Sequence, residues 1–166
     1  MMRKIVPDVI SGQTLVTVKP NDTARGIAKL MHESRIAAVL VTESDALVGI
    51  ITERDMTTRV IAGGLDPDTT KAKDIMTADP DTLHPDDTPA QAIKMMIERN
   101  YRHLPVTDGE SLVGMVSVRD LYAIYNLELE EDLKDRNAFI YGENYGMRLH
   151  FSRSPCLHRM GGIRAS

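Results

Sequence analysis

Apolar residues recur at helical spacing in two stretches of the chain, and polar residues that favour a helix start precede each stretch. The first stretch is Ala24–Met31, which follows the polar segment Asn21–Thr23. The second follows Asp86–Thr88, has Pro89 at its first helical position and carries Gln91 where a capping box needs it. The pattern predicts two amphipathic helices, each with one buried face.

Each predicted helix is followed by two short apolar runs rich in β-branched residues. The first pair is AAVLVT and LVGII, separated by ESDA, and the second is LPVT and LVGMV, separated by DGES. Short runs around a polar turn predict a β-hairpin in both places. A further helix is expected after Asp55, closed by Gly63 and Gly64, and another after Asp120. With a strand before the first helix, each unit is strand, helix, strand, strand, helix.

The two units are copies of one another. Gly114 follows Gly49, and Asp120 follows Asp55, by the same 65 positions (114 − 49 and 120 − 55). A unit of about sixty residues is too small to bury much apolar surface alone, so we expect the two to pack together as one globule.

We divide the chain into a first unit of residues 1–66, a second unit of residues 67–127 and an extension of residues 128–166. The extension contains no third copy of the repeat. Acidic residues crowd its first positions, whereas residues 146–166 contain four arginines and no acidic residue. We expect a helical extension followed by a weakly structured tail that contains the arginines.

The composition is that of an ordinary globular protein. Of the 166 residues, 42% are hydrophobic and 27% are charged, and the formal net charge of −4 disfavours a nucleic-acid partner. The single cysteine excludes an intrachain disulfide framework and suits a reducing compartment. No apolar run has the length of a membrane span or a signal peptide, so we expect a cytoplasmic protein with no membrane partner.

The repeated motifs GIITERD and GMVSVRD bring a hydroxyl, an arginine and an acid to the point where a strand meets a helix. Helix-opening amides, the Thr52 hydroxyl and the Arg54 guanidinium suit a phosphate. The Asp55 carboxylate repels a phosphate, but it is a natural acceptor for the hydroxyls of a ribose. Gly49 and Gly114, inside the strands, permit close approach of another group such as a flat base. Together these residues suit a sugar phosphate.

The same spacing also has a purely structural interpretation. A hydroxyl followed three residues later by an acid forms a capping box, and a duplicated cap repeats just as a duplicated site would. The spacing alone leaves both interpretations open. His150, Cys156 and His158 lack a fourth metal ligand, so no metal site is predicted. Within the repeats, no P-loop or catalytic triad stands out.

The arrangement resembles the CBS domain family, and two copies in tandem resemble a Bateman module. The matching residues are DVIS with VTVKPNDTARGIAKLMHESRIAAVLVTESDALVGIITERD in the first copy, and DIMT with DTLHPDDTPAQAIKMMIERNYRHLPVTDGESLVGMVSVRD in the second. The resemblance implies an α/β (α+β) fold of two β-α-β-β-α units, packed by their sheets with pseudo-twofold symmetry. It also implies two related clefts for adenosine compounds and a homodimer of modules.

The resemblance further implies which residues contact a ligand. Asp55 and Asp120 correspond to the family's ribose-holding acids, and Thr52 and Ser117 correspond to its hydroxyl contacts. The remaining contacts correspond to positions near Thr17 and Thr82 and to the strand starts Ile36–Ala38 and Tyr101–His103.

The two implied clefts differ in charge. The second copy has Arg102 and His103 where the first has Ala37 and Ala38, so with Arg119 it offers charge-assisted contacts to phosphates. We expect the Asp120 cleft to bind the phosphates and the Asp55 cleft to be weaker, empty or adenosine-only. The stronger cleft is assigned Arg102, His103, Ser117, Arg119, Asp120, Thr17, Ile36 and Ala37, and the weaker one Thr52, Arg54, Asp55, Thr82 and Tyr101.

The sequence thus favours a stand-alone regulatory module that binds AMP, ADP, ATP or S-adenosylmethionine and signals to a partner protein by a change of conformation. We expect no catalytic activity and no required cofactor, and the target protein is unknown. Two alternatives stay open. One is a ligand-free dimerisation scaffold in which the hydroxyl and acid pairs act only as caps, and the other is a regulatory subunit of a separate enzyme or transporter.

Overall fold

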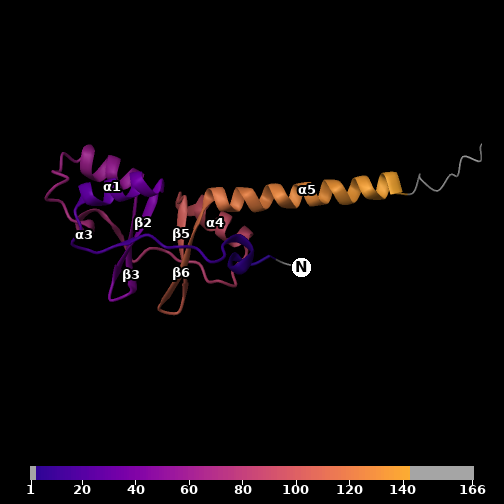
Figure 1. Ribbon diagram of the computed structural model, residues 1–166, viewed down its shortest axis with the longest axis horizontal. Helices are drawn as coiled ribbons and strands as arrows, with labels where there is room; N and C mark the ends of the chain where they lie inside the picture. Colours follow the sequence, from indigo (N-terminus) through magenta and orange to yellow (C-terminus); the bar gives the residue numbers. More distant parts are fainter. Residues whose placement is uncertain (1–2, 143–166) are drawn as a thin grey trace, which may run out of the picture. The chain divides into compact units, whose positions relative to one another are not determined.

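The computed structural model describes residues 3–142, which Figure 1 shows in colour. The chain divides into two compact units, Met1–Leu127 and Glu128–Ser166, and both repeats lie in the first. The first repeat contains η1 (Ile5–Val9), β1 (Thr17–Val18), α1 (Ala24–Ser34), β2 (Ala38–Glu43), β3 (Ala46–Thr52), α2 (Glu53–Asp55) and η2 (Met56–Ile61), where η marks a π-helical turn. After a linker follow α3 (Ala72–Ile75), β4 (Thr77–Ala78), α4 (Pro89–Arg99), β5 (His103–Asp108), β6 (Ser111–Ser117) and α5 (Val118–Gly142).

The two amphipathic helices begin at the predicted caps. The Thr23 hydroxyl accepts a hydrogen bond from the Gly26 amide at 3.2 Å, and the Thr88 hydroxyl accepts one from the Gln91 amide at 3.3 Å. In return, Oε1 of Gln91 accepts a bond from the Thr88 amide at 2.7 Å, which completes the predicted capping box. Because neighbouring residues satisfy each helix start, the beginnings of α1 and α4 follow from the local sequence.

Both predicted hairpins are present. β2 pairs antiparallel with β3, and β5 pairs antiparallel with β6. The first turn holds Ser44 and Asp45 at positive φ, 49° and 67°, as a two-residue hairpin turn of this kind requires. Each hairpin carries a register shift at the same place, after Val41 in the first copy and after Val106 in the second. The likeness of the two copies therefore extends to an irregularity of the backbone.

The two hairpins belong to separate sheets. The first sheet has the strand order β1-β2-β3-β4, with β1 parallel to β2 and β4 antiparallel to β3. The second sheet consists of β5 and β6, and Leu83 adds an isolated parallel bridge to Val106. β4 belongs to the second copy of the repeat. A strand from outside the first copy therefore completes the first sheet.

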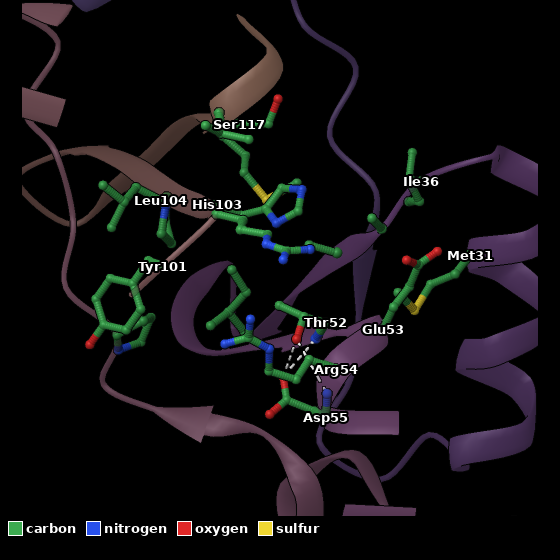
Figure 2. Close-up of a pocket in the computed structure, with 18 of the residues that line it drawn as sticks. Met31, Ile36, Thr52, Glu53, Arg54, Asp55, Tyr101, His103, Leu104 and Ser117 are labelled. Atoms are coloured by element: carbon green, nitrogen blue, oxygen red, sulfur yellow. Dashed lines mark hydrogen bonds between the residues drawn. The ribbon is translucent and has the colours of Figure 1, made fainter. Parts of the chain in front are cut away.

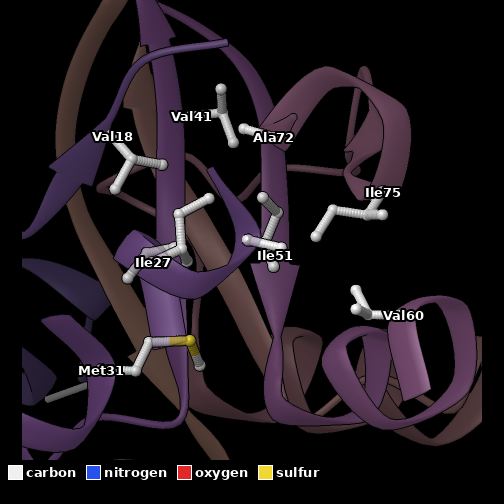
Figure 3. Close-up of a cluster of buried hydrophobic side chains, with 10 residues drawn as sticks. Val18, Ile27, Met31, Val41, Ile51, Val60, Ala72 and Ile75 are labelled. Atoms are coloured by element: carbon white, nitrogen blue, oxygen red, sulfur yellow. The ribbon is translucent and has the colours of Figure 1, made fainter. Parts of the chain in front are cut away.

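The two hydrophobic cores also exchange short segments. The first core includes Ala72 and Ile75 of α3, which lie beside Ile51 and Val60 in Figure 3 although α3 begins the second copy. The second core includes Ile5 from the N-terminal segment, and Figure 1 shows this indigo segment next to α4. Each core is thus filled partly by the opposite copy.

Backbone hydrogen bonds hold the exchanged segments in place. The Ile5 amide donates to the Asp87 carbonyl at 2.7 Å, and the Ala72 amide donates to the Asp22 carbonyl at 2.8 Å. Asp22 and Asp87 are equivalent positions of the two copies, so the exchange follows the same relation as the repeat. The division between residues 66 and 67 stays a prediction, and neither side of it contains a complete core.

Gly49 and Gly114 make room for residues that follow the exchanged segments. A Cβ atom on Gly49 would lie 2.5 Å from Sδ of Met76, and one on Gly114 would lie 2.3 Å from Cδ1 of Ile10. Both distances are too short for a side chain without movement of the neighbour. The expectation that these glycines admit a flat base is therefore corrected, because the chain's own Met76 and Ile10 make the close approach.

The two sheets pack against each other through a third apolar cluster. Ala38, Leu40 and Ile50 of the first sheet are buried, and Leu112 and Met115 of the second sheet pack against them. Removing these residues from water contributes roughly 25 cal/mol for each square ångström of apolar surface. This packing confirms the predicted fold class of two units joined by their sheets.

Helix α5 extends beyond the repeats. It begins at Val118 and continues to Gly142, and the division of the chain at residue 128 stays a prediction. The predicted weakly structured tail lies outside the described residues.

We expect the substitution Ile5→Ala to reduce the free energy of unfolding by about 2–5 kcal/mol, because Ile5 is fully buried and its truncation leaves a cavity in the second core. Urea unfolding followed by circular dichroism measures this loss. Lys4→Ala is the neighbouring control and should change the stability much less, since the ion pair of Lys4 with Asp86 is exposed. Equal stability of Ile5→Ala and the unmodified protein would contradict the assignment of this segment to the second core.

Candidate functional site

Both copies of the repeated motif form the same corner between a strand and a helix. Thr52 is the last residue of β3 and pairs with Ala38, while Ser117 is the last residue of β6 and pairs with His103. In the second copy, the first amide of the following helix donates to the Arg102 carbonyl at 2.9 Å. Each corner therefore places the start of one strand beside the start of a helix. The residue at that strand start is Ala38 in the first corner and His103 in the second.

An acid closes each corner through a capping interaction. Oδ2 of Asp55 accepts hydrogen bonds from the amide and the hydroxyl of Thr52, at 2.8 and 2.6 Å. Oδ2 of Asp120 accepts the equivalent bonds from Ser117, at 2.7 and 2.6 Å. The structural interpretation of the motif is thus realised in both copies. Because the cap uses one carboxylate oxygen, the same acid keeps a second oxygen for another contact.

The second carboxylate oxygen has different surroundings in the two copies. Oδ1 of Asp55 lies 3.2 Å from Nε of Arg59, four residues further along the chain. The equivalent of Arg59 in the second copy is Ile124, a buried apolar residue. Among the side chains that the structure describes, none forms a hydrogen bond or an ion pair with Oδ1 of Asp120. Oδ1 of Asp120 is therefore available as a hydrogen-bond acceptor, whereas Oδ1 of Asp55 is paired with Arg59.

Both corners open onto one cavity of about 1220 Å³. Figure 2 shows Thr52 and Asp55 of the first copy on one side of it, and Tyr101, His103 and Ser117 of the second copy on the other. Two separate clefts were expected, whereas the described structure joins the two corners in a single space. The volume exceeds the 300–1,000 Å³ or so that is usual for one small-molecule pocket.

Most of the residues that the sequence assigns to the two clefts line this cavity. They are Ile36, Ala37, Thr52, Arg54, Asp55, Tyr101, Arg102, His103, Ser117, Arg119 and Asp120.

Thr17 and Thr82 do not line this cavity. Each stands one position before a residue of a hydrophobic core, Val18 in the first core and Leu83 in the second. Successive side chains of an extended chain point to opposite faces, so both threonine side chains are exposed while their neighbours are buried.

The cavity is also lined by residues outside the set predicted from the sequence. Gln13 lines it, and its Oε1 accepts a hydrogen bond from the Met115 amide at 2.9 Å. Glu53 and Asp81 add acidic groups to its wall. Gln13 and Asp81 lie far from the repeated motif, so no local pattern marks them. Glu53 lies inside the motif, and its charge could have been noticed there.

Charged side chains surround His103 at the second corner. Burial of the imidazole lowers the pKa of His103 below its ordinary value of 6.5. The carboxylates of Asp120 and Glu53 oppose this shift, whereas the guanidinium groups of Arg102 and Arg119 add to it. Both arginines are exposed, and neither forms an ion pair within the described part of the chain. A bound anion near them would favour the charged form of His103.

Burial also affects a second titratable group of the cavity. It raises the pKa of the Tyr101 hydroxyl above its ordinary value of 10.0, and the hydrogen-bonded Asp81 carboxylate acts in the same direction. Tyr101 is therefore a neutral hydroxyl at physiological pH, and its aromatic ring adds an apolar surface to the wall of the cavity.

The sequence pattern of the CBS domain family matches residues 4–62 and 72–126. The chain belongs to this family. The two matched segments correspond to the two copies of the repeat, so the protein contains a CBS domain pair, which confirms the predicted resemblance.

Curated relatives extend over most of this chain. The uncharacterised protein MK0525 of Methanopyrus kandleri is 33% identical over 138 residues, which are 80% of this chain and 70% of that protein. The mitochondrial CBS domain-containing protein CBSX3 of Arabidopsis thaliana is 35% identical over 127 residues, 74% of this chain and 62% of its own length.

Solved structures share the fold. A CBS-domain protein of Burkholderia ambifaria, provisionally described as acting in signal transduction, is 34% identical with a TM-score of 0.69, over 72% of this chain and 91% of its own. The CBS domain pair of MJ0100, in complex with 5′-methylthioadenosine and S-adenosyl-L-methionine, is 22% identical with a TM-score of 0.67, over 77% and 99%. A hexameric CBS-CP12 protein from bloom-forming cyanobacteria is 25% identical with a TM-score of 0.66, over 87% and 91%.

Two further properties concern only the described residues. None of their helices combines the length and the apolar composition of a bilayer span. No group of three or more His, Cys, Asp or Glu side chains among them is arranged to hold a metal ion. The tail residues His150, Cys156 and His158 lie outside this part of the chain.

We expect His103 to titrate below pH 6.5, because burial disfavours its charged form. As the pH falls through 6.5, the unfolded chain takes up a proton that the folded protein does not yet bind, so the free energy of unfolding decreases until the pH reaches the folded pKa. NMR titration of the imidazole measures the pKa. His103→Gln should remove this part of the pH dependence in urea unfolding between pH 7 and 5. A titration at or above pH 6.5 would contradict the expectation.

Proposed function

We propose that this protein is a regulatory module that binds an adenosine nucleotide or a related adenosyl compound in the cavity between its two CBS domains. The observation that carries the proposal is the second corner. There the unengaged Oδ1 of Asp120 lies on the same cavity as Ser117, His103, Arg102 and Arg119. An acceptor for a ribose and several donors for phosphates are thus available in one place.

The chemistry of these groups fits the two parts of a nucleotide. A carboxylate accepts hydrogen bonds from the two ribose hydroxyls, and Asp120 has an oxygen available for them. Guanidinium groups bind phosphate oxygens through charge-assisted hydrogen bonds, a role that suits Arg102 and Arg119. The apolar side chains of Ile36 and Val118 line the same cavity and give a base an uncharged surface.

The position of the cavity suggests how binding is communicated. Residues of both CBS domains line it, so a ligand that contacts both favours one relative arrangement of the two domains. A partner protein that recognises this arrangement then responds to the nucleotide concentration. We propose no catalytic step. The partner is a separate protein, such as an enzyme or a transporter.

Comparisons with related proteins support the adenosine class of ligand. The CBS domain pair of MJ0100, which shares the fold, is a complex with 5′-methylthioadenosine and S-adenosyl-L-methionine. The Burkholderia protein of the family is provisionally described as acting in signal transduction. We therefore propose AMP, ADP, ATP and S-adenosylmethionine as the compounds to be tested first.

We expect Asp120→Ala to weaken nucleotide binding about tenfold or more, because a hydrogen bond between a ribose and a charged acceptor is worth about a decade in affinity. Asp55→Ala removes an equivalent cap from the first copy and should weaken binding less. Isothermal titration with the four compounds compares the two variants, and circular dichroism verifies that both are folded.

Two outcomes of this titration would contradict the proposal. Equal losses in the two variants would show that the corner at Asp120 is not the preferred site. The absence of heat and of any thermal shift with all four compounds at millimolar concentration would refute nucleotide binding itself.

A ligand-free dimerisation scaffold is the second candidate, and one observation favours it. The helices of the second copy expose large apolar side chains, Ile97 of α4 at 75% and Tyr122 of α5 at 67%. The equivalent residues of the first copy are His32 and Thr57, which are polar. Both helices also contribute to the second core, through Met96 of α4 and Leu121 of α5. Large apolar side chains that stay exposed on these helices suit a self-complementary contact with a second copy of the chain.

We expect the protein to form a dimer and Ile97→Gln to shift it toward the monomer, because the variant loses apolar surface at the proposed contact. Light scattering coupled to size-exclusion chromatography measures the molar mass. Lys94→Gln on the same helix is the control and should leave the mass unchanged. A dimer that binds none of the four compounds would favour the scaffold, whereas a monomeric unmodified protein would refute it.

A further inference from the structure

We propose that Arg59 blocks the ribose-binding acid of the first CBS domain and thereby limits each chain to one nucleotide, bound at the Asp120 corner. The inference rests on the proposed function and assigns a specificity-determining role to a residue that does not line the cavity. It follows from the contacts of Arg59, from the surroundings of the carboxylate oxygen that each cap leaves available and from the residue at the equivalent position of the second copy.

Arg59 is held by four contacts. Its Nε lies 3.2 Å from Oδ1 of Asp55. One terminal nitrogen donates to the carbonyls of Ile75 and Met76, each at 2.7 Å, and the other donates to the hydroxyl of Thr77 at 3.1 Å. Every nitrogen of the guanidinium group is therefore engaged, and only one of the contacts is with the acid.

The ion pair engages the oxygen of Asp55 that the cap leaves available. An ionised carboxylate offers about four lone-pair positions on its two oxygens. Both acids use two of them in the cap, at Oδ2. Oδ1 of Asp55 is ion-paired with the Arg59 guanidinium group at 3.2 Å, whereas no described residue pairs with Oδ1 of Asp120. The hydroxyls of a ribose therefore meet an available carboxylate oxygen at Asp120, and at Asp55 they meet an oxygen that already faces a cation.

The other contacts of Arg59 make it difficult to displace. If the side chain moved away to release Asp55, the carbonyls of Ile75 and Met76 would lose their hydrogen bonds to it. Ile75 belongs to the exchanged segment that completes the first core, and Met76 follows it directly. Figure 3 shows Val60, the next residue after Arg59, beside Ile75. A ligand at the first corner would therefore have to compete with the packing of the domain as well as with one ion pair.

The second copy has no equivalent obstruction. Ile124 stands at the position of Arg59, is buried and carries no charge that could engage Asp120. The helix starts of the two corners also differ, since the first has Glu53 where the second has Val118. The two corners thus have the same cap but different capacities for a nucleotide.

Arg59→Met in the full chain tests this inference, because Met keeps an aliphatic side chain and removes the guanidinium group. Isothermal titration with ADP should give one site per chain for the unmodified protein and two sites for Arg59→Met. Addition of Asp55→Ala should remove the new site, whereas addition of Asp120→Ala should weaken the original one about tenfold or more. Arg25→Met is the matched control, since Arg25 pairs with Asp68 away from the cavity, and it should retain one site.

A reciprocal variant keeps the test decisive if Arg59→Met does not fold. Ile124→Arg places a guanidinium group at the equivalent position of the second copy and should weaken ADP binding about tenfold or more. Two sites in the unmodified protein, or one site in a folded Arg59→Met together with unchanged affinity of Ile124→Arg, would overturn the inference and leave nucleotide binding intact. Absence of binding in every folded variant and in the unmodified protein would overturn both proposals.

Discussion

The exchange of short segments between the two CBS domains is the constraint on which the rest of the structure depends. The first core needs Ile75 from the beginning of the second copy, and the second core needs Ile5 from the N-terminal segment. Each copy alone would leave part of its core exposed, and about sixty residues bury too little surface to compensate. The exchange therefore ties the two domains into one folding unit and determines which residues face the space between them.

The two corners of the cavity between the domains have the same backbone and cap geometry, but the side chains around the two caps differ in charge. The cap that joins Thr52 to Asp55 has the same geometry as the cap that joins Ser117 to Asp120, within 0.1 Å for each of the two bonds to Oδ2. The side chains around the caps differ, because alanines line one corner where Arg102 and His103 line the other. Because the positive charge of Arg102 lies at the second corner, an anionic ligand is favoured there over the equivalent position at the first corner.

Several parts of the candidate site were predictable from the sequence, and others were not. The spacing of Ser117 and Asp120 predicted their hydrogen bonds, because capping involves residues three positions apart. The pair of Asp55 and Arg59 also has a recognisable spacing, four residues on one helical face, although its consequence for the first corner was not anticipated. Gln13 has no such signal, since it reaches the cavity from an irregular segment.

By itself the sequence determined the repeat, the helix starts, the two hairpins and the membership of the family, because these depend on contacts between residues close together along the chain or on the recurrence of a pattern. Only the tertiary structure decided which segments complete which core, how Gly49 and Gly114 are used and that the two corners share one cavity. These features depend on contacts between separate segments of the chain, such as that of Gly49 with Met76, 27 positions apart (76 − 49), and that of Gly114 with Ile10, 104 positions apart (114 − 10). Such contacts form only when the two sheets pack and the exchanged segments are in place.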